Sequence, residues 1–172
     1  MCGIVGGIAE RSITNILVEG LKRLEYRGYD SAGLALINNH QVLRERRVGK
    51  VSNLEQAVNE SKISGSLGIA HTRWATHGKP TEENAHPHIS ENVAVVHNGI
   101  IENYQELKDD LEALGYVFTS QTDTEVVAHL INDALKSTPS LLEAVRQVVP
   151  QLKGAYALGI VHTDHPDELI TV

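Results

Sequence analysis

The feature that most constrains the fold is a set of short, continuously apolar blocks separated by amphipathic segments. The blocks cover residues 4–9, 67–71, 93–96 and 155–161. A strand with apolar residues at successive positions has to be buried on both faces. Two sheets stacked face to face, with helices over their outer faces, would bury all of these blocks. We therefore expect such a sandwich, and a three-layer α/β sandwich is the alternative.

Local signals place helices and one hairpin between these blocks. A Ser, Thr or Asn followed three residues later by Glu is a capping box, a common start of a helix. Capping boxes predict helices that begin near Asn103, Thr122 and Ser140. Residues 33–37 and 42–48 are predicted to be two strands that pair as a hairpin across a polar turn.

Composition limits the class of protein. With 172 residues and 41% hydrophobic residues, the chain can form one domain with its own core, so we take 1–172 as a single domain. The net charge of −7 argues against nucleic acid or an anionic membrane as a partner, because both bind basic surfaces. No segment resembles a membrane span or a secretory signal. We expect a cytoplasmic protein, which agrees with a lone cysteine that cannot form an internal disulfide.

That lone cysteine, Cys2, follows the initiator Met1 directly. Removal of Met1 would place a thiol and a free α-amine on one residue. An α-amine titrates near about pH 7.7–8.0 and a thiol near about 8.5, so the amine could serve as the base for the sulfur nucleophile. The alternative is that Cys2 is a small buried hydrophobic residue that opens a strand.

Asn98-Gly99 follows an apolar block and has two interpretations. The pair is typical of a two-residue hairpin turn, but no evident return strand follows before the next helix. The alternative is an oxyanion site, in which the Asn98 side-chain amide and the Gly99 backbone N–H bind a developing negative oxygen. Glycine there would let the backbone approach a substrate closely.

Arg73 lies at the end of an apolar block, beside Trp74, Thr76 and His77 in a loop closed by Gly and Pro. An arginine side chain binds a carboxylate through two parallel hydrogen bonds, so it could anchor an amino-acid ligand. A solvated surface arginine is the alternative. Asp123 could cap a helix or hold a ligand ammonium group, and the residues alone leave both roles open.

The histidines of the middle third of the chain raise the possibility of a metal site. Their spacing does not match a helical His-Glu-x-x-His motif, and a single cysteine excludes a multi-cysteine zinc site. We expect no metal and no cofactor. Residues 85–88, which include His86, are instead predicted to form a rigid loop whose histidines make local hydrogen bonds.

Five motifs in this order resemble the class II glutamine amidotransferases, which are N-terminal-nucleophile hydrolases. The motifs are residues 2–6, 26–33, 71–78, 97–99 and 122–125, and the resemblance covers essentially the whole chain. It implies an α+β fold, a four-layer αββα sandwich.

The resemblance also implies the chemistry. Cys2 would attack the side-chain amide of L-glutamine, release ammonia and leave a γ-glutamyl thioester for water to hydrolyse. Asn98 and Gly99 would form the oxyanion hole. Arg73 would bind the substrate carboxylate and Asp123 its α-ammonium group.

Other site residues are implied in the same way. Trp74, Thr76 and His77 would belong to a loop that closes over the substrate. Arg27 would support the surroundings of the nucleophile, and His86 and His97 would be supporting residues.

Within the family, residues 26–30, 74–77 and 85–88 are similar to those of the branch that makes an amino sugar from fructose 6-phosphate. We expect that sugar to bind only to isomerase domains absent from this sequence, and the glutaminase domain to be incomplete at its C-terminus. The full-length protein is expected to be a homo-oligomer. The alternatives are a glutamine-binding or regulatory fragment without activity, and another class II amidotransferase.

Overall fold

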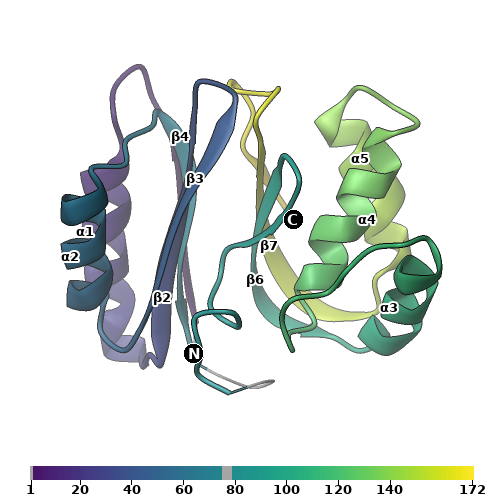
Figure 1. Cartoon of the computed structure of the whole chain (residues 1–172), viewed down its shortest axis with the longest axis horizontal. Coiled ribbons are helices and arrows are strands. Elements are labelled where there is room, and N and C mark those ends of the chain that lie inside the picture. Colours follow the sequence, from purple (N-terminus) through teal and green to yellow (C-terminus); the bar gives the residue numbers. More distant parts are fainter. Residues whose placement is uncertain (1, 75–78) are drawn as a thin grey trace.

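The computed structural model describes residues 2–74 and 79–172. It has four layers: a pair of helices, two facing sheets and a second group of helices (Figure 1). The expected four-layer αββα arrangement is therefore confirmed, and the three-layer alternative is wrong.

The first sheet is antiparallel throughout and has the strand order β1-β4-β2-β3. Two helices cover its outer face, and a 3₁₀ turn, η1, follows the first of them (Figure 1). In chain order these elements are β1 (Gly3–Ile8), α1 (Thr14–Leu24), η1 (Glu25–Arg27), β2 (Ser31–Asn38), β3 (Gln41–Val48), α2 (Val51–Ser61) and β4 (Leu67–Arg73).

The second sheet is also antiparallel and has the strand order β5-β6-β7-β8. Three helices lie on its outer face (Figure 1). The elements are β5 (His88–Ser90), β6 (Val93–Ile101), α3 (Tyr104–Ala113), α4 (Glu125–Leu135), α5 (Leu141–Val148), the 3₁₀ turn η2 (Val149–Gln151), β7 (Gly154–His162) and β8 (Ile170–Thr171).

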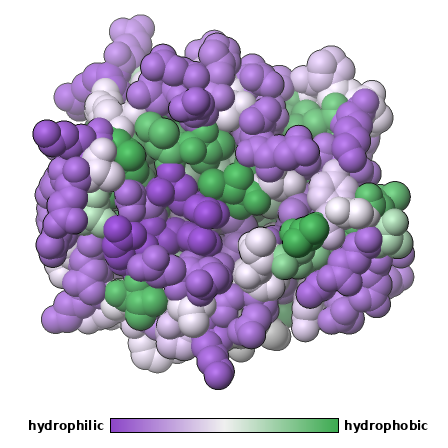
Figure 2. All heavy atoms as spheres, viewed as in Figure 1, coloured by the Kyte–Doolittle hydropathy of each residue, from purple (hydrophilic) through white to green (hydrophobic). Residues whose placement is uncertain are grey.

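Each junction between layers has its own apolar cluster. Leu17 and Leu54 belong to the cluster between the first helices and the first sheet. Ile69 and Val96 meet in the cluster between the two sheets. Ile131 belongs to the cluster between the second sheet and its helices. Burial at all three junctions explains the apolar blocks, and the face shown in Figure 2 is mostly hydrophilic with small, separate apolar groups.

Two strands differ from their sequence-based predictions. The strand predicted over 4–9 was expected to be buried on both faces, but β1 is an edge strand and Ile8 is 47% exposed. The strand predicted over 93–96 extends to Ile101, because β7 pairs with it along its whole length. The hairpin is confirmed: Asn38 pairs with Gln41 across a tight turn.

The capping predictions have mixed outcomes. The Ser140 hydroxyl accepts a hydrogen bond from the Glu143 backbone N–H at 3.3 Å, as a helix cap does. Asn103 lies at the cap position of α3 but makes no such bond; its side chain binds the backbone of residues 151 and 153 instead. Thr122 does not cap α4, whose cap position is Thr124. Local spacing predicted the positions of the helices, but two of the three predicted capping side chains make tertiary contacts instead of capping a helix.

Candidate active site

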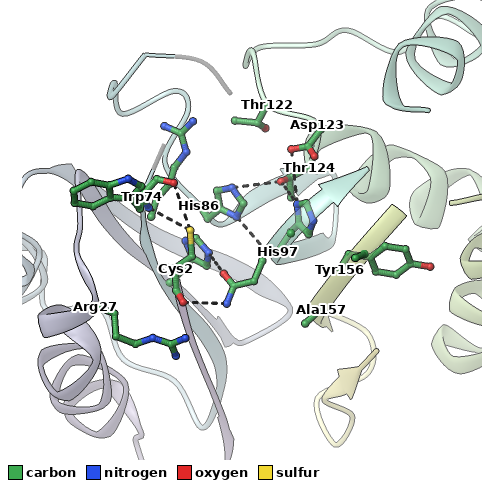
Figure 3. A pocket seen from close by; sticks show the side chains of 15 residues that line it. Cys2, Arg27, Trp74, His86, His97, Thr122, Asp123, Thr124, Tyr156 and Ala157 are labelled. Atoms are coloured by element: carbon green, nitrogen blue, oxygen red, sulfur yellow. Dashed lines mark hydrogen bonds and ion pairs between the residues drawn. The ribbon is translucent and has the colours of Figure 1, made fainter. Parts of the chain in front are cut away.

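A cavity of about 540 Å³ lies where β1 and β4 of the first sheet face β6 and β7 of the second (Figure 3). It gathers predicted site residues that lie far apart in the sequence. Thr76 and His77 fall outside the described residues. The predicted residues that line the cavity are Cys2, Arg27, Arg73, Trp74, His86, His97, Asn98, Gly99 and Asp123.

Cys2 immediately precedes β1 and is half-buried at the cavity. The register of β1 on β4, with Gly3 opposite Thr72, brings Cys2 to the end of β4. The Trp74 backbone N–H donates to the Cys2 Sγ at 3.2 Å, and the sulfur lies 3.6 Å from the Trp74 carbonyl oxygen. The thiol therefore faces the cavity with an N–H donor beside it, and Cys2 is not a fully buried core residue.

Asn98 and Gly99 lie within β6, so the hairpin-turn alternative is wrong. The Asn98 Nδ2 donates to the Cys2 carbonyl oxygen at 3.3 Å. Its Oδ1 lies 2.8 Å from the His71 Nε2. A carboxamide nitrogen carries two hydrogens, so one remains for a second acceptor beside Cys2.

The neighbouring strand, β7, leaves no room for a side chain at Gly99. Its φ is +124°, and a Cβ at this position would lie 2.1 Å from the Ala155 carbonyl oxygen. No side chain fits there without moving β7. The sequence suggested close approach to a substrate as the reason for this glycine, and the structure adds close approach to β7.

The cavity presents one buried cation and one buried anion. Arg73 is 4% exposed; its Nη1 lies 3.8 Å from the Asp30 Oδ1 and donates to the Lys79 carbonyl at 3.4 Å. The Asp123 Oδ2 accepts from the Ile101 N–H at 2.8 Å. Asp123 therefore joins the segment before α4 to the end of β6, and Arg73 is not a solvated surface residue.

A buried network connects three segments of the chain at the wall of the cavity. His86 Nδ1 accepts from the His97 N–H at 3.2 Å, and His86 Nε2 lies 3.4 Å from the Thr124 Oγ1. The same Thr124 hydroxyl bonds the His97 Nδ1 at 2.8 Å. The prediction that histidines of residues 85–88 bond locally is wrong, because the partners of His86 lie 11 and 38 residues away.

Burial keeps these histidines neutral. It lowers the pKa of His71 to about 4, against the opposing effect of its hydrogen bond to Asn98. Burial also lowers the pKa of His86 well below its usual value, and the neighbouring histidines add to this effect. The pKa of His97 is lowered by burial, although Asp123 favours its charged form. Neutral rings can each donate through one nitrogen and accept through the other.

Trp74 and Arg27 lie at the rim of the cavity. Trp74 is 53% exposed, and its ring packs over Gly28, where a Cβ would lie 2.5 Å from the indole. Gly28 has a φ of +99°, which also favours glycine. Arg27 is exposed and lines the cavity from η1. Gly28 was missed as a site residue, although it lies within the motif 26–33.

His71 and Thr124 were also missed as functional candidates. His71 ends an apolar block two residues before Arg73, and Thr124 lies in the motif of residues 122–125. Both residues belong to these motifs, and this was the feature of the sequence that could have indicated them. Their hydrogen-bond partners lie 27 or 38 residues away, so local spacing did not indicate them.

No three His, Cys, Asp or Glu side chains of residues 2–74 and 79–172 are grouped so that they could hold a metal ion. The same part of the chain contains no helix that is long and apolar enough to cross a bilayer.

Comparison with protein families gives a match over residues 71–172 to the glutamine amidotransferase domain. The chain is 83% identical over 172 residues to the glutamine–fructose-6-phosphate aminotransferase (isomerizing) of Acinetobacter baylyi. It is 64% identical over 172 residues to the enzyme of that name from Pseudomonas putida. These matches cover 100% and 99% of this chain, but only 28% of the length of either relative.

Solved structures give the same family. The glutamine phosphoribosylpyrophosphate amidotransferase from B. subtilis, complexed with ADP and GMP, superposes with a TM-score of 0.78 and 31% identity, covering 99% of this chain and 36% of that one. A structure described as the allosteric regulatory enzyme of purine biosynthesis gives a TM-score of 0.75 and 33% identity, covering 94% and 35%. Because the family match spans more than half of the sequence and agrees with the fold, this chain belongs to the glutamine amidotransferase domain family.

Proposed function

We propose that the chain hydrolyses the side-chain amide of L-glutamine to glutamate and ammonia through a Cys2 thioester. The observation that carries the proposal is one cavity holding the only cysteine beside a carboxamide donor, with a buried cation and a buried anion at its walls. Those groups match the parts of glutamine: an amide to be cleaved, a carboxylate and an ammonium group.

The reaction follows from the chemistry of these groups. The Cys2 α-amine takes the proton of the thiol and becomes an ammonium group, and the sulfur attacks the amide carbon. The negative oxygen that forms accepts hydrogen bonds from the Asn98 Nδ2 and the Gly99 N–H. Each such donor lowers the barrier by roughly 3 kcal/mol. The C–N bond then breaks as the nitrogen takes a proton from the Cys2 α-ammonium group, and ammonia leaves. Water, activated by the same amine, hydrolyses the thioester to glutamate.

The charged residues would position the substrate. Arg73 binds the α-carboxylate, since a guanidinium matches its two oxygens. Asp123 binds the α-ammonium group, with its Oδ2 held by the Ile101 N–H. Trp74, Thr76 and His77 would close over the bound substrate, Arg27 would support the rim, and His86 and His97 would support the Asn98 side of the cavity.

The relatives support a larger context for this reaction. The chain spans 28% of the length of two enzymes named glutamine–fructose-6-phosphate aminotransferase (isomerizing). We therefore propose that 1–172 is a glutaminase domain, the ammonia-supplying half of glucosamine-6-phosphate synthesis. Fructose 6-phosphate would bind only to other domains of the protein. A cytoplasmic location and homo-oligomeric assembly are part of this proposal, and nucleic acid and membranes are not partners.

The test uses the chemistry of residue 2. While Met1 is attached, the Cys2 nitrogen is an amide and cannot act as a base. Ammonia release from glutamine is measured for chains with and without Met1, whose masses are checked. Only the processed chain should be active, and an electrophilic glutamine analogue should label its Cys2. Equal rates would remove the mechanism, and glutamine binding without labelling or turnover would favour a binding fragment.

A further inference from the structure

The oxyanion function of Asn98 depends on which way its carboxamide faces. The two ends of the group have the same shape, but only Nδ2 can donate a hydrogen bond. If the group were reversed, the Oδ1 would face the Cys2 carbonyl oxygen and the developing oxyanion, and both contacts would be repulsive. The structure therefore has to contain something that selects one orientation.

The carboxamide oxygen of Asn98 faces His71, a residue of β4. His71 is 1% exposed, and its Nε2 lies 2.8 Å from the Asn98 Oδ1. Because a carboxamide oxygen only accepts, the hydrogen of this bond has to come from the Nε2. At the other end of the group, Nδ2 donates to the Cys2 carbonyl at 3.3 Å. The hydrogen bonds at the two ends of the carboxamide thus favour the same orientation.

The ring of His71 is held in place by a second imidazole ring. It stacks on the His86 ring at a centroid distance of 4.2 Å and an interplanar angle of 14°. The His86 loop is seated against β2, where a Cβ on Gly33 would lie 2.1 Å from the His86 carbonyl oxygen. A ring fixed in this way directs its Nε2–H at one point only.

The second ring nitrogen permits this tautomer. Burial lowers the pKa of His71 to about 4, so at neutral pH only one nitrogen carries hydrogen. The backbone of His97 lies beside the ring and favours its charged form. However, Nδ1 makes no hydrogen bond of acceptable geometry with the described residues. The hydrogen is therefore better placed on Nε2, where Asn98 accepts it.

We propose that His71 is a positioning residue, whose Nε2–H holds the Asn98 carboxamide with its NH₂ toward Cys2, where the oxyanion forms. This inference rests on the proposed glutaminase function. His71 does not touch the substrate in this scheme. It acts through Asn98, and its effect belongs to the transition state, because the negative oxygen exists only there.

Kinetics of three variants test this role. His71→Phe keeps a stacked ring but removes the donor, and we expect kcat to fall about 10- to 100-fold, less than the loss of an oxyanion donor itself. The KM for glutamine and the Kd for the product glutamate should change less than about twofold. His71→Gln carries an N–H near the position of Nε2 and should recover part of kcat. His129→Phe, a buried histidine of α4 outside the cavity, is the matched control for destabilisation and should keep its activity.

The tautomer can be measured without turnover. Ring ¹⁵N chemical shifts of His71 at pH 7.5 distinguish Nε2–H from Nδ1–H, and we expect Nε2–H. An Nδ1–H tautomer, or a His71→Phe enzyme with unchanged kcat, would overturn the inference while leaving the glutaminase proposal intact. A processed wild-type chain that releases no ammonia would instead remove the proposed function, and the ¹⁵N measurement would still decide the orientation of Asn98.

Discussion

The two sides of the cavity are built differently. On the nucleophile side, Cys2 is half-buried next to an edge strand, and its sulfur contacts the Trp74 backbone. On the other side, His86, His97 and Thr124 form a buried network whose hydrogen bonds measure 2.8–3.4 Å. The side that carries the proposed oxyanion donors is thus fixed by packing before any substrate binds, whereas the proposed nucleophile depends on an edge strand and on the state of residue 1. Substitutions on the Cys2 side should therefore change activity without changing stability, whereas substitutions on the buried side should change both.

The largest effect on activity is expected from Cys2→Ala. Glutamine turnover should fall at least about 10³-fold, because no other residue replaces the sulfur nucleophile. The free energy of unfolding should change by less than about 1 kcal/mol, because a small, half-buried side chain is removed. Steady-state ammonia release and chemical denaturation measure the two quantities. A loss of several kcal/mol would contradict the contrast between the two sides.

Gly99→Ala should reduce both activity and stability. The added Cβ would meet the Ala155 carbonyl oxygen at 2.1 Å, and the φ of +124° is unfavourable for alanine. We expect kcat to fall about 10²-fold, as for a misplaced oxyanion donor, and a loss of stability larger than strain alone, which is about 1–3 kcal/mol.

Gly115→Ala is the matched control for this substitution. Its φ is +91°, but nothing lies within 4 Å of the added Cβ. Gly115→Ala should lose only the stability that corresponds to backbone strain, about 1–2 kcal/mol, and its turnover should be unchanged. If both variants lost equal stability, the contact of Gly99 with β7 would not matter.

The effect that is smallest at neutral pH is a pH dependence of stability, which belongs to the buried side and grows only as the pH falls. The folded pKa of His71 is about 4, below its unfolded value of 6.5. As the pH falls from about 6.5 to 4, the unfolded chain binds a proton that the folded chain does not, so stability decreases by up to about 1.4 kcal/mol per pH unit for each such histidine. Above pH 7 this contribution is absent.

Denaturant unfolding from pH 4.5 to 8 measures this slope. In the His71→Phe variant, the number of protons taken up on unfolding should be smaller by nearly one in this pH range, so the slope should be smaller. The reason is that the unfolded variant has one fewer histidine to protonate. An unchanged slope would show that His71 takes up its proton over the same pH range in the folded and the unfolded protein, so the rigid side of the cavity would become charged as the pH falls below about 6.5.

Sequence alone predicted the layers and named most of the residues that line the cavity. Apolar blocks require burial on two faces, and that requirement predicted the stacked sheets. The order of five motifs predicted the family, and the resemblance that these motifs carry assigned roles to Cys2, Arg73 and Asp123, for which the residues alone had left alternatives open. These features are local or compositional, so they are present in the sequence itself.

The tertiary structure decided what local patterns left open. Asn98-Gly99 is a strand segment because β7 pairs with it, with Tyr156 opposite Gly99. His71 and Thr124 became part of the site through partners 27 or 38 residues away. The side chain of Asn103 binds the backbone of residues 151 and 153 rather than the N-terminus of its own helix. Each outcome depends on a contact between distant parts of the chain, and such contacts exist only once the two sheets have packed together.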